Sequence, residues 1–262
     1  MLHLFGNGSH VACGGAAAIQ GWEWSVKGPP GSSTRFLPSP DVPEPTLLVD
    51  VAGLYAVSLA VVDDAGVSSA TPAEYSVSVI PDQALWIELL WSIKDYPEEG
   101  NSEIAWDGTP DLHLAHVLAD EGPDVDADGN VEPWFILPYD AWWFNPDPDW
   151  GPPGPEGNPL HMSWGQGGGG PEAITVLGPE FLAYRIGVHY QDEGYGPALV
   201  TVRVYVFSVL AFELTDVWLH DCDVWEVGAV EWPSGKVMVA TDGVGAPKIL
   251  NCSLWCFHGD GW

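Results

Sequence analysis

Positive charge is scarce in this chain. Its 262 residues contain 7 Lys and Arg against 37 Asp and Glu, for a formal net charge of −30. Such a chain repels a polyanion, so we expect no nucleic-acid partner and no attraction to an acidic membrane. The acidic residues are spread through turns. This leaves two interpretations open: a solubilising surface, or carboxylates arranged for divalent cations.

Long apolar runs and helical periodicity are also lacking. No run of about 18 apolar residues is present, so we predict no membrane insertion. Residues 1–5 (Met-Leu-His-Leu-Phe) lack the basic start, apolar centre and small-residue cleavage site of a signal peptide. Tandem β modules with few lysines nevertheless favour export. We therefore expect an extracellular or cell-surface location, with a leader preceding Met1 in a longer protein.

Cysteine is equally sparse, with four residues in the chain. Cys252 and Cys256 are followed by His258, but a zinc site normally needs four ligands and a second pair is missing. We expect a disulfide or two free thiols there. Cys13 and Cys222 lie far apart in the sequence, and Cys222 is interpreted as a small residue at the turn before a strand.

Gly and Pro are abundant instead, at 31 and 24 residues, and many short runs alternate between apolar and polar residues. This predicts an all-β fold of two tandem β-sandwiches. We expect an immunoglobulin-like module over residues 1–81 and a larger, jelly-roll-like antiparallel sandwich over 82–242. The latter carries a Trp-, Pro- and Asp-rich insertion at about 120–171. Residues 243–262 are expected to form an irregular tail.

The first part carries its pattern in residues 21–26 (Gly-Trp-Glu-Trp-Ser-Val) and in the alternating run 53–66. Tyr55 stands where an immunoglobulin-like sandwich caps a corner, and Trp24 where an aromatic residue fills the centre. From Gly53 to Gly66 the chain resembles the Gly-x-Tyr-x-Val-x-Leu-x-Val-x-Asp-x-x-Gly pattern of the PKD (polycystic kidney disease) domain family. That family's Trp-x-Phe-Gly-Asp-Gly turn is not matched. The resemblance covers residues 1–80 and implies a spacer or adhesion module.

The second part has three motifs, at residues 111–114 (Asp-Leu-His-Leu), 134–140 (Trp-Phe-Ile-Leu-Pro-Tyr-Asp) and 187–190 (Gly-Val-His-Tyr). In these it is similar to a secreted bacterial β-sandwich domain of unknown function that accompanies PKD-like modules. The resemblance covers residues 85–240 and implies architecture rather than a reaction. Relatives carry an acidic stretch where this chain has residues 160–164 (Leu-His-Met-Ser-Trp). A metal site that uses this stretch is therefore expected to be weakened.

The sharpest local motif is the run Asp-Val-Asp-Ala-Asp-Gly-Asn at residues 124–130. Oxygen ligands at alternate positions followed by Gly are typical of a calcium loop, which makes calcium the expected cofactor. An EF-hand is excluded because Phe135 stands where its bidentate Glu would be, although Glu132 or a distant carboxylate could replace that Glu. An unliganded acidic turn is the alternative. The candidate calcium ligands are Asp124, Asp126, Asp128 and Asn130.

A second group combines histidines with carboxylates, namely Asp107, Asp111, His113 and His116. On a strand, Asp111 and His113 point the same way, and His189 and Asp192 could meet them across the sheet. A transition metal suits such a set. Surface histidines hydrogen-bonded to turn aspartates are the alternative, and base rates favour it.

The insertion is rich in aromatic residues beside Asp and Asn, a combination that sugar rings or peptides contact. We expect Trp142, Trp143 and Trp150 to bind a carbohydrate or an extracellular protein, with Asp111 and His113 as further contacts. The alternative is a long loop that packs on its own rings.

No Gly-x-Ser-x-Gly, His-Glu-x-x-His or phosphate-binding loop is present in the sequence. We therefore predict a secreted or cell-surface, non-catalytic binding or adhesion protein, stabilised by calcium. One alternative is a polysaccharide-active hydrolase with the first module as spacer, which requires two carboxylates about 5 to 10 Å apart in one cleft. The other is a structural repeat unit of an adhesin or fibre.

Overall fold

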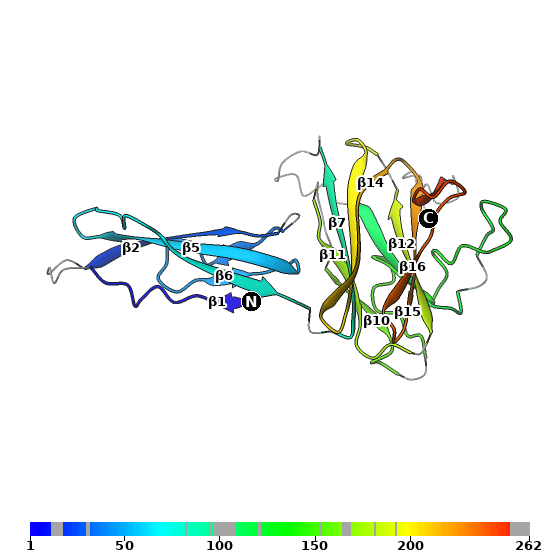
Figure 1. Cartoon of the computed structure of the whole chain (residues 1–262), viewed down its shortest axis with the longest axis horizontal. Helices are drawn as coiled ribbons and strands as arrows, with labels where there is room; N and C mark the ends of the chain where they lie inside the picture. Colours follow the sequence, from blue (N-terminus) through cyan, green and yellow to red (C-terminus); the bar gives the residue numbers. More distant parts are fainter. Residues whose placement is uncertain are drawn as a thin grey trace. The chain divides into compact units, whose positions relative to one another are not determined.

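The chain is built from strands and turns in the computed structural model, and no described residue lies in a helix. This confirms the all-β prediction. The chain divides into two compact units, residues 1–80 and 81–262, which are described separately (Figure 1). No described segment forms a helix with the length and apolarity needed to cross a membrane. The described residues are 1–11, 18–29, 32–81, 83–94, 96, 108–119, 122–151, 154–163, 169–180, 182–191 and 193–251.

The first unit contains two three-stranded antiparallel sheets. The pairing order is β1 (Leu2–His3), β4 (Thr46–Leu48), β3 (Arg35–Leu37) in one, and β2 (Ile19–Lys27), β5 (Gly53–Asp63), β6 (Ala73–Val79) in the other. Because side chains alternate along β5, Tyr55 and Val57 are buried while Leu54 is exposed. Among the described residues of this unit, the other buried apolar side chains are those of Leu47, Val51 and Ala52.

Tyr55 closes a corner of the first unit. Its ring is fully buried, and its hydroxyl donates to the Val51 carbonyl at 2.8 Å and accepts from the Val51 amide at 3.0 Å. Burial raises the pKa of Tyr55, which keeps the hydroxyl protonated as a donor. The neighbouring Trp24 is half-buried, and its indole nitrogen donates to the Val42 carbonyl at 3.0 Å. The corner position expected for Tyr55 is confirmed, whereas the half-buried Trp24 does not fill the centre of the unit as expected.

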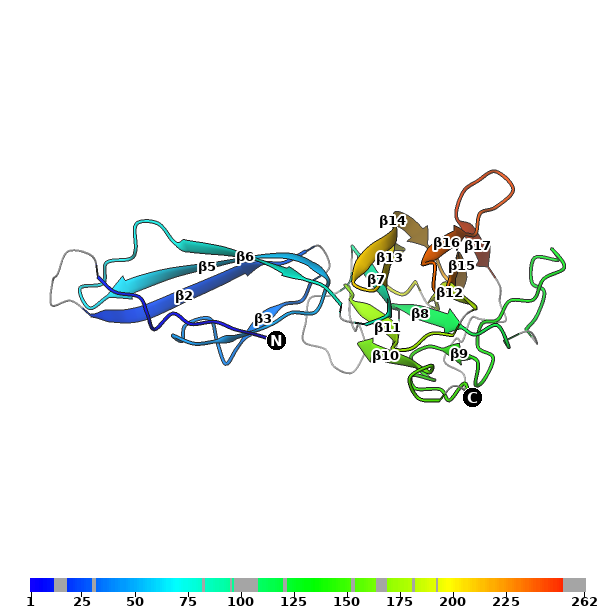
Figure 2. The ribbon, with the colours of Figure 1, turned by 60° about the horizontal axis from the view of Figure 1, so that its bottom comes forward.

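The second unit is a sandwich of two antiparallel sheets (Figure 1, Figure 2). The five-stranded sheet has the order β10 (Pro159–Ser163), β11 (Glu172–Val176), β7 (Leu85–Ile93), β13 (Ala198–Val206), β14 (Val209–Leu219). The six-stranded sheet has the order β16 (Lys236–Val239), β15 (Asp223–Glu231), β12 (Ala183–Tyr190), β8 (Pro110–Ala115), β9 (Asp140–Ala141), and β17 (Lys248–Asn251) also pairs with β15.

The core of this sandwich takes alternate residues from strands of both sheets, including Ile87 and Val202 from one sheet and Leu112, Leu114 and Val188 from the other. Since successive side chains of a strand point to opposite faces, Asp111, His113 and Ala115 lie on the outer face of the six-stranded sheet. Residues of the insertion cover that face. Ala115 packs there in a second, smaller apolar cluster with Ala119, Trp134, Val224 and Leu250.

The insertion is anchored to the sheet rather than to itself alone. Trp134 is buried, and the Arg185 guanidinium lies 5.6 Å from the centre of its ring and donates to the Val131 carbonyl at 2.8 Å. Gly187 leaves room for the ring, because a Cβ there would lie 2.7 Å from Trp134. Trp150 belongs to the main core. The insertion is therefore a structural layer of the second unit.

Two expectations about the end of the chain need correction. Residues 248–251 form β17, with Asn251 opposite Asp223, so the expected irregular tail is wrong for this part. A four-residue strand is too short to show periodicity. Cys222 forms a disulfide bond and is not merely a small turn residue. Its partner lies outside the described residues, as do Cys13, Cys252, Cys256 and the rest of the predicted tail.

We predict that Tyr55→Phe destabilises the first unit by about 1–3 kcal/mol, because it leaves the buried Val51 amide without its partner. Urea unfolding of the full chain measures the loss, and hydrogen exchange assigns it to residues 1–80. Tyr75→Phe on β6 is the matched control, since Tyr75 is 72% exposed. An equal loss in both variants would contradict the corner role of Tyr55.

Candidate functional site

Five ionisable side chains are buried together in the second unit, each at most 6% exposed. We call them the buried cluster: Asp111, His113, Asp140, His161 and Glu172. They come from β8, β9, β10 and β11, strands of both sheets. His161 lies opposite Ile174 in the register, so it shares the inner face of its sheet with Ile174 and Glu172. The Leu112 amide of β8 donates to Glu172 Oε2 at 2.6 Å and links the two sheets.

His113 lies between two carboxylates of the buried cluster. Its Nδ1 is 2.7 Å from Asp140 Oδ2, and its Nε2 is 3.4 Å from Asp111 Oδ2. Burial alone would lower the pKa of His113, but Asp140 and Asp111 outweigh it and raise that pKa to about 10. The imidazole is therefore a cation at neutral pH. Its ring stacks on Trp142, with the ring centres 5.8 Å apart.

Asp111, His161 and Glu172 converge on one point within the buried cluster. One oxygen or nitrogen from each lies within 4.8 Å of the other two. His161 Nε2 is 3.2 Å from Glu172 Oε1. Burial and the charge of Asp111 raise the pKa of Glu172 to about 7. Burial acts to lower the pKa of His161, but Glu172 and Asp111 raise it above its ordinary value. An imidazole and two carboxylates thus lie together in the protein interior.

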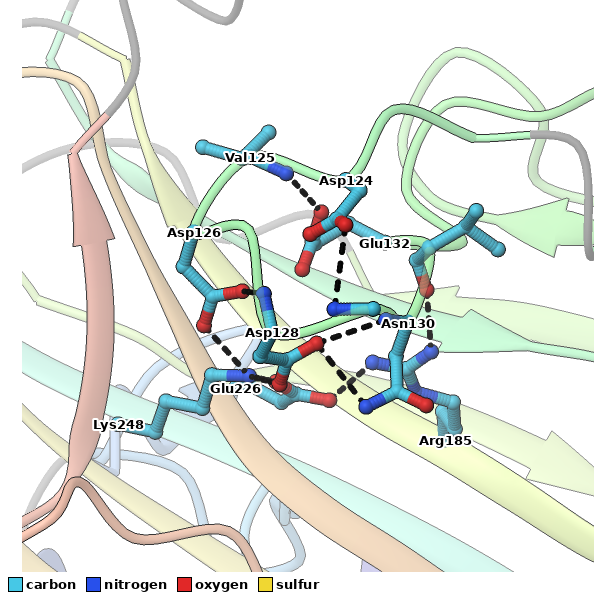
Figure 3. A network of polar contacts seen from close by, with 11 residues as sticks. Asp124, Val125, Asp126, Asp128, Asn130, Glu132, Arg185, Glu226 and Lys248 are labelled. Carbon is cyan, nitrogen blue, oxygen red and sulfur yellow. Dashed lines mark hydrogen bonds and ion pairs between the residues drawn. The ribbon is translucent and has the colours of Figure 1, made fainter.

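The predicted calcium ligands lie in an exposed turn, residues 124–132, which we call the acidic loop (Figure 3). Ligand oxygens of Asp124, Asp126 and Asp128 lie within 4.8 Å of one another. Asp124 Oδ2 accepts from the Gly129 amide at 3.1 Å, and the φ of +91° at Gly129 favours glycine at this turn. The side chain of Asn130 donates to Asp128 at 2.9 Å.

Glu132 is a fourth carboxyl group of the acidic loop and is only 1% exposed. Its Oε2 accepts from the Val125 amide at 2.7 Å, whereas its buried Oε1 has no hydrogen-bond partner among the described residues. Figure 3 shows this carboxyl group beside that of Asp124. Burial raises the pKa of Glu132. The loop therefore holds a buried oxygen that lacks a partner next to three exposed aspartates.

One basic residue, Lys248, pairs with carboxylates of the acidic loop in the described part of the chain. Lys248 Nζ lies 2.9 Å from Asp126, 3.1 Å from Asp128 and 3.0 Å from Glu226 (Figure 3). Arg185 pairs with Glu226 from the other side. Partial burial acts to lower the pKa of Lys248, but Asp126, Glu226 and Asp128 raise it. The ammonium group therefore remains charged and holds two of the predicted calcium ligands.

The histidines of the sequence-predicted metal group are buried. His113 is fully buried and His189 is 3% exposed, so the interpretation as surface histidines is wrong for both. Their rings are 6.1 Å apart. His116 lies apart from the buried cluster, with its Nε2 3.8 Å from Glu180 and its ring against Trp150. Asp107 and Asp192 lie outside the described residues.

The three predicted tryptophan contacts are split between core and surface. Trp142 and Trp150 are each 6% exposed, so their ring faces are packed within the protein and not presented to a ligand. Trp150 stacks on Tyr184, and its indole nitrogen donates to the Pro138 carbonyl at 3.0 Å. Trp143 and Phe144 are exposed and pack edge to face, with the ring centres 5.6 Å apart. We call this pair the aromatic tip.

Sequence reasoning missed His161, Glu172 and Asp140 as site residues. The stretch 160–164 was expected to be poor in metal ligands, yet His161 points inward from it. A single histidine carries no spacing signal, and its neighbours in space lie on other strands. One signal was available in the sequence. In Leu160-His161-Met162 a polar residue alternates with apolar residues, as on a strand, which places His161 on the opposite face from its neighbours.

Comparisons with protein-family models, with curated proteins and with solved structures found no match to this chain. The resemblances of residues 1–80 and 85–240 therefore stay predictions, and the function is argued from the chemistry of the two carboxylate sites and the aromatic tip.

Proposed function

We propose that this chain is an exported, non-catalytic carbohydrate-binding protein whose second sandwich is stabilised by calcium at the acidic loop. One observation carries the calcium assignment. Glu132, buried and with an oxygen that lacks a partner in the described part of the chain, lies beside the three clustered aspartates. Buried carboxyl oxygens are normally satisfied, and calcium coordinates such oxygens.

The donor chemistry of the acidic loop suits calcium. Calcium takes six to eight oxygens at about 2.3–2.6 Å, from carboxylates, backbone carbonyls and water. Asp124, Asp126, Asp128 and Glu132 supply carboxylates, and Asn130 occupies the position whose backbone carbonyl binds in such loops. The Lys248 ammonium would have to leave Asp126 and Asp128. Glu226, 3.0 Å from Lys248, remains to pair with it.

The ordered insertion supports the binding role. Arg185 of β12 holds the acidic loop by donating to the Val131 carbonyl, so a cation in the loop would stabilise the layer that carries the aromatic tip. Exposed aromatic rings beside carboxylates suit a sugar, and Asp147 and Asp149 are both exposed near the tip in sequence. The Cys222 disulfide supports export, because such bonds persist in oxidising compartments.

Calcium is expected to raise the unfolding temperature of the full chain by several degrees. A ligand that binds only the folded state adds about 2.7 kcal/mol at a hundred times its Kd. Circular dichroism melts in millimolar calcium and in chelator measure the shift. Asp126→Asn combined with Asp128→Asn should abolish it. Asp242→Asn is the matched control, an exposed turn aspartate that accepts from Val244 and Ala246. No shift in the unmodified chain would refute the assignment.

Lys248→Met tests whether the ammonium and calcium compete for the same carboxylates. Without calcium, this variant should melt below the wild type because Asp126 and Asp128 lose their counter-charge. Calcium should then bind about thirtyfold more tightly, since a single positive charge some 4 Å from a divalent cation costs about 2 kcal/mol in water. Calorimetric titration measures the affinity. If the calcium affinity of Lys248→Met equals that of the wild type, calcium does not bind at Asp126 and Asp128, and the assignment to the acidic loop is wrong.

The aromatic tip is expected to carry the carbohydrate contact. Trp143→Ala with Phe144→Ala should reduce oligosaccharide binding at least tenfold, because stacking area is lost while the buried Trp142 remains in place. Tryptophan fluorescence across a glycan panel measures it. Trp218→Ala is the control, since Trp218 on β14 is 52% exposed. If no glycan of the panel changes the fluorescence of the unmodified chain, the carbohydrate proposal is refuted and a protein ligand becomes the alternative.

A further inference from the structure

The buried cluster has a property that the acidic loop lacks: its converging groups include an imidazole. Asp111 on β8, His161 on β10 and Glu172 on β11 bring their ligand atoms within 4.8 Å of one another. We propose that these three residues bind one divalent transition-metal ion, represented by Zn²⁺, where β8 of one sheet of the second sandwich meets β10 and β11 of the other. This site goes beyond the proposed calcium and carbohydrate binding.

The spacing of the donor atoms suits a metal of this size. Nitrogen and oxygen ligands lie about 2.0–2.2 Å from zinc, so neighbouring donors of a tetrahedral site are separated by roughly 3.3–3.6 Å. His161 Nε2 and Glu172 Oε1 are 3.2 Å apart. The imidazole and the two carboxylates thus need only small side-chain movements to enclose an ion.

Each of the two carboxylates accepts a backbone hydrogen bond through one of its oxygens. Asp111 Oδ1 accepts from the Trp143 amide at 3.3 Å, and Glu172 Oε2 accepts from the Leu112 amide at 2.6 Å. The other oxygen of Asp111, Oδ2, accepts no hydrogen bond among the described residues and only lies 3.4 Å from His113 Nε2. Glu172 Oε1 faces His161. This division into a fixed and an available oxygen is typical of metal ligands.

A second layer of contacts orients Asp111. His113 lies against it, and the other ring nitrogen of His113 is 2.7 Å from Asp140, which also accepts from the Phe135 amide at 2.6 Å. Outer residues that fix the ligands are part of metal sites, and changing them weakens binding. His113 and Asp140 are positioning residues here, since neither belongs to the converging set of three.

Charge also favours a divalent ion. Asp111 and Glu172 are both nine-tenths buried or more, and burying two neighbouring carboxylates is costly unless a cation compensates them. Among the described residues, their ion-pair contacts are with histidines. The mixed nitrogen and oxygen set points to a transition metal, because calcium prefers oxygen alone. A bound ion would cross-link β8 of one sheet to β10 and β11 of the other.

Zinc titration of the full chain tests the site. Bound metal is first removed from the protein with chelator. The protein is then transferred to buffer with millimolar calcium, which occupies the acidic loop so that zinc does not bind there. Zinc is added and its binding is measured by calorimetry. We expect one Zn²⁺ per chain. Glu172→Gln keeps an acceptor for Leu112 but removes the charge, and it should weaken zinc binding at least a hundredfold, as should His161→Gln. Stoichiometry below a tenth of an equivalent in the unmodified chain would overturn the proposal.

Two controls separate this site from other zinc-binding groups. His116→Gln removes another buried imidazole, one that contacts Glu180, and should leave zinc affinity within twofold. Binding that survives in Glu172→Gln but is lost in Cys252→Ser with Cys256→Ser would assign the ion to the cysteines and refute the site. If circular dichroism shows that His161→Gln does not fold, two other measurements test the proposal: zinc binding by Glu172→Gln, and the absorption spectrum of Co²⁺ bound to the unmodified chain. Absence of bands from nitrogen and oxygen ligation would count against the proposal.

Discussion

Compensation of buried carboxylates in a chain with few cations is the constraint on which the second unit depends. It buries Glu88, Asp111, Glu132, Asp140, Glu172, Asp223 and Glu226, yet the whole chain has only seven Lys and Arg. Arg203 pairs with Glu88, and Arg185 and Lys248 with Glu226. Histidines and backbone amides compensate the others. Each of these three cations therefore connects two segments, and replacing one leaves a buried carboxylate with one charge partner fewer.

The insertion follows from this constraint. Since Leu112 and Leu114 of β8 face the core, Asp111 and His113 face outward and would be exposed to solvent if the insertion did not cover them. The insertion covers them with aromatic rings, and Asp140 comes from the insertion itself to meet His113. A polar pair is thus buried beneath a hydrophobic layer, and its hydrogen bond specifies how that layer sits. Composition alone does not distinguish such a layer from an exposed aromatic platform.

What the sequence predicts depends on how far apart the interacting residues are along the chain. Alternation identified long strands such as β5, β12 and β13. Tyr55 was placed from its position at the start of such a strand, and its partner in the structure, Val51, is only four residues away. The acidic loop is contiguous and was recognised. The converging set of Asp111, His161 and Glu172 was not, because its members come from two different sheets and are up to about sixty residues apart in the sequence. Burial of Trp142 and Trp150 is likewise a tertiary outcome that local pattern does not encode.

The two proposed cation sites contact the insertion at different points. Arg185 of β12 holds the acidic loop through the Val131 carbonyl, whereas Asp111 in the buried cluster accepts a hydrogen bond from the Trp143 amide of the aromatic tip. An ion that fixes Asp111 would therefore restrict Trp143. By thermodynamic linkage, a ligand that binds only the restricted tip would tighten metal binding by the same factor. The hydrogen bond from Trp143 to Asp111 is the physical path for this coupling, since it joins an exposed residue directly to a buried ligand atom.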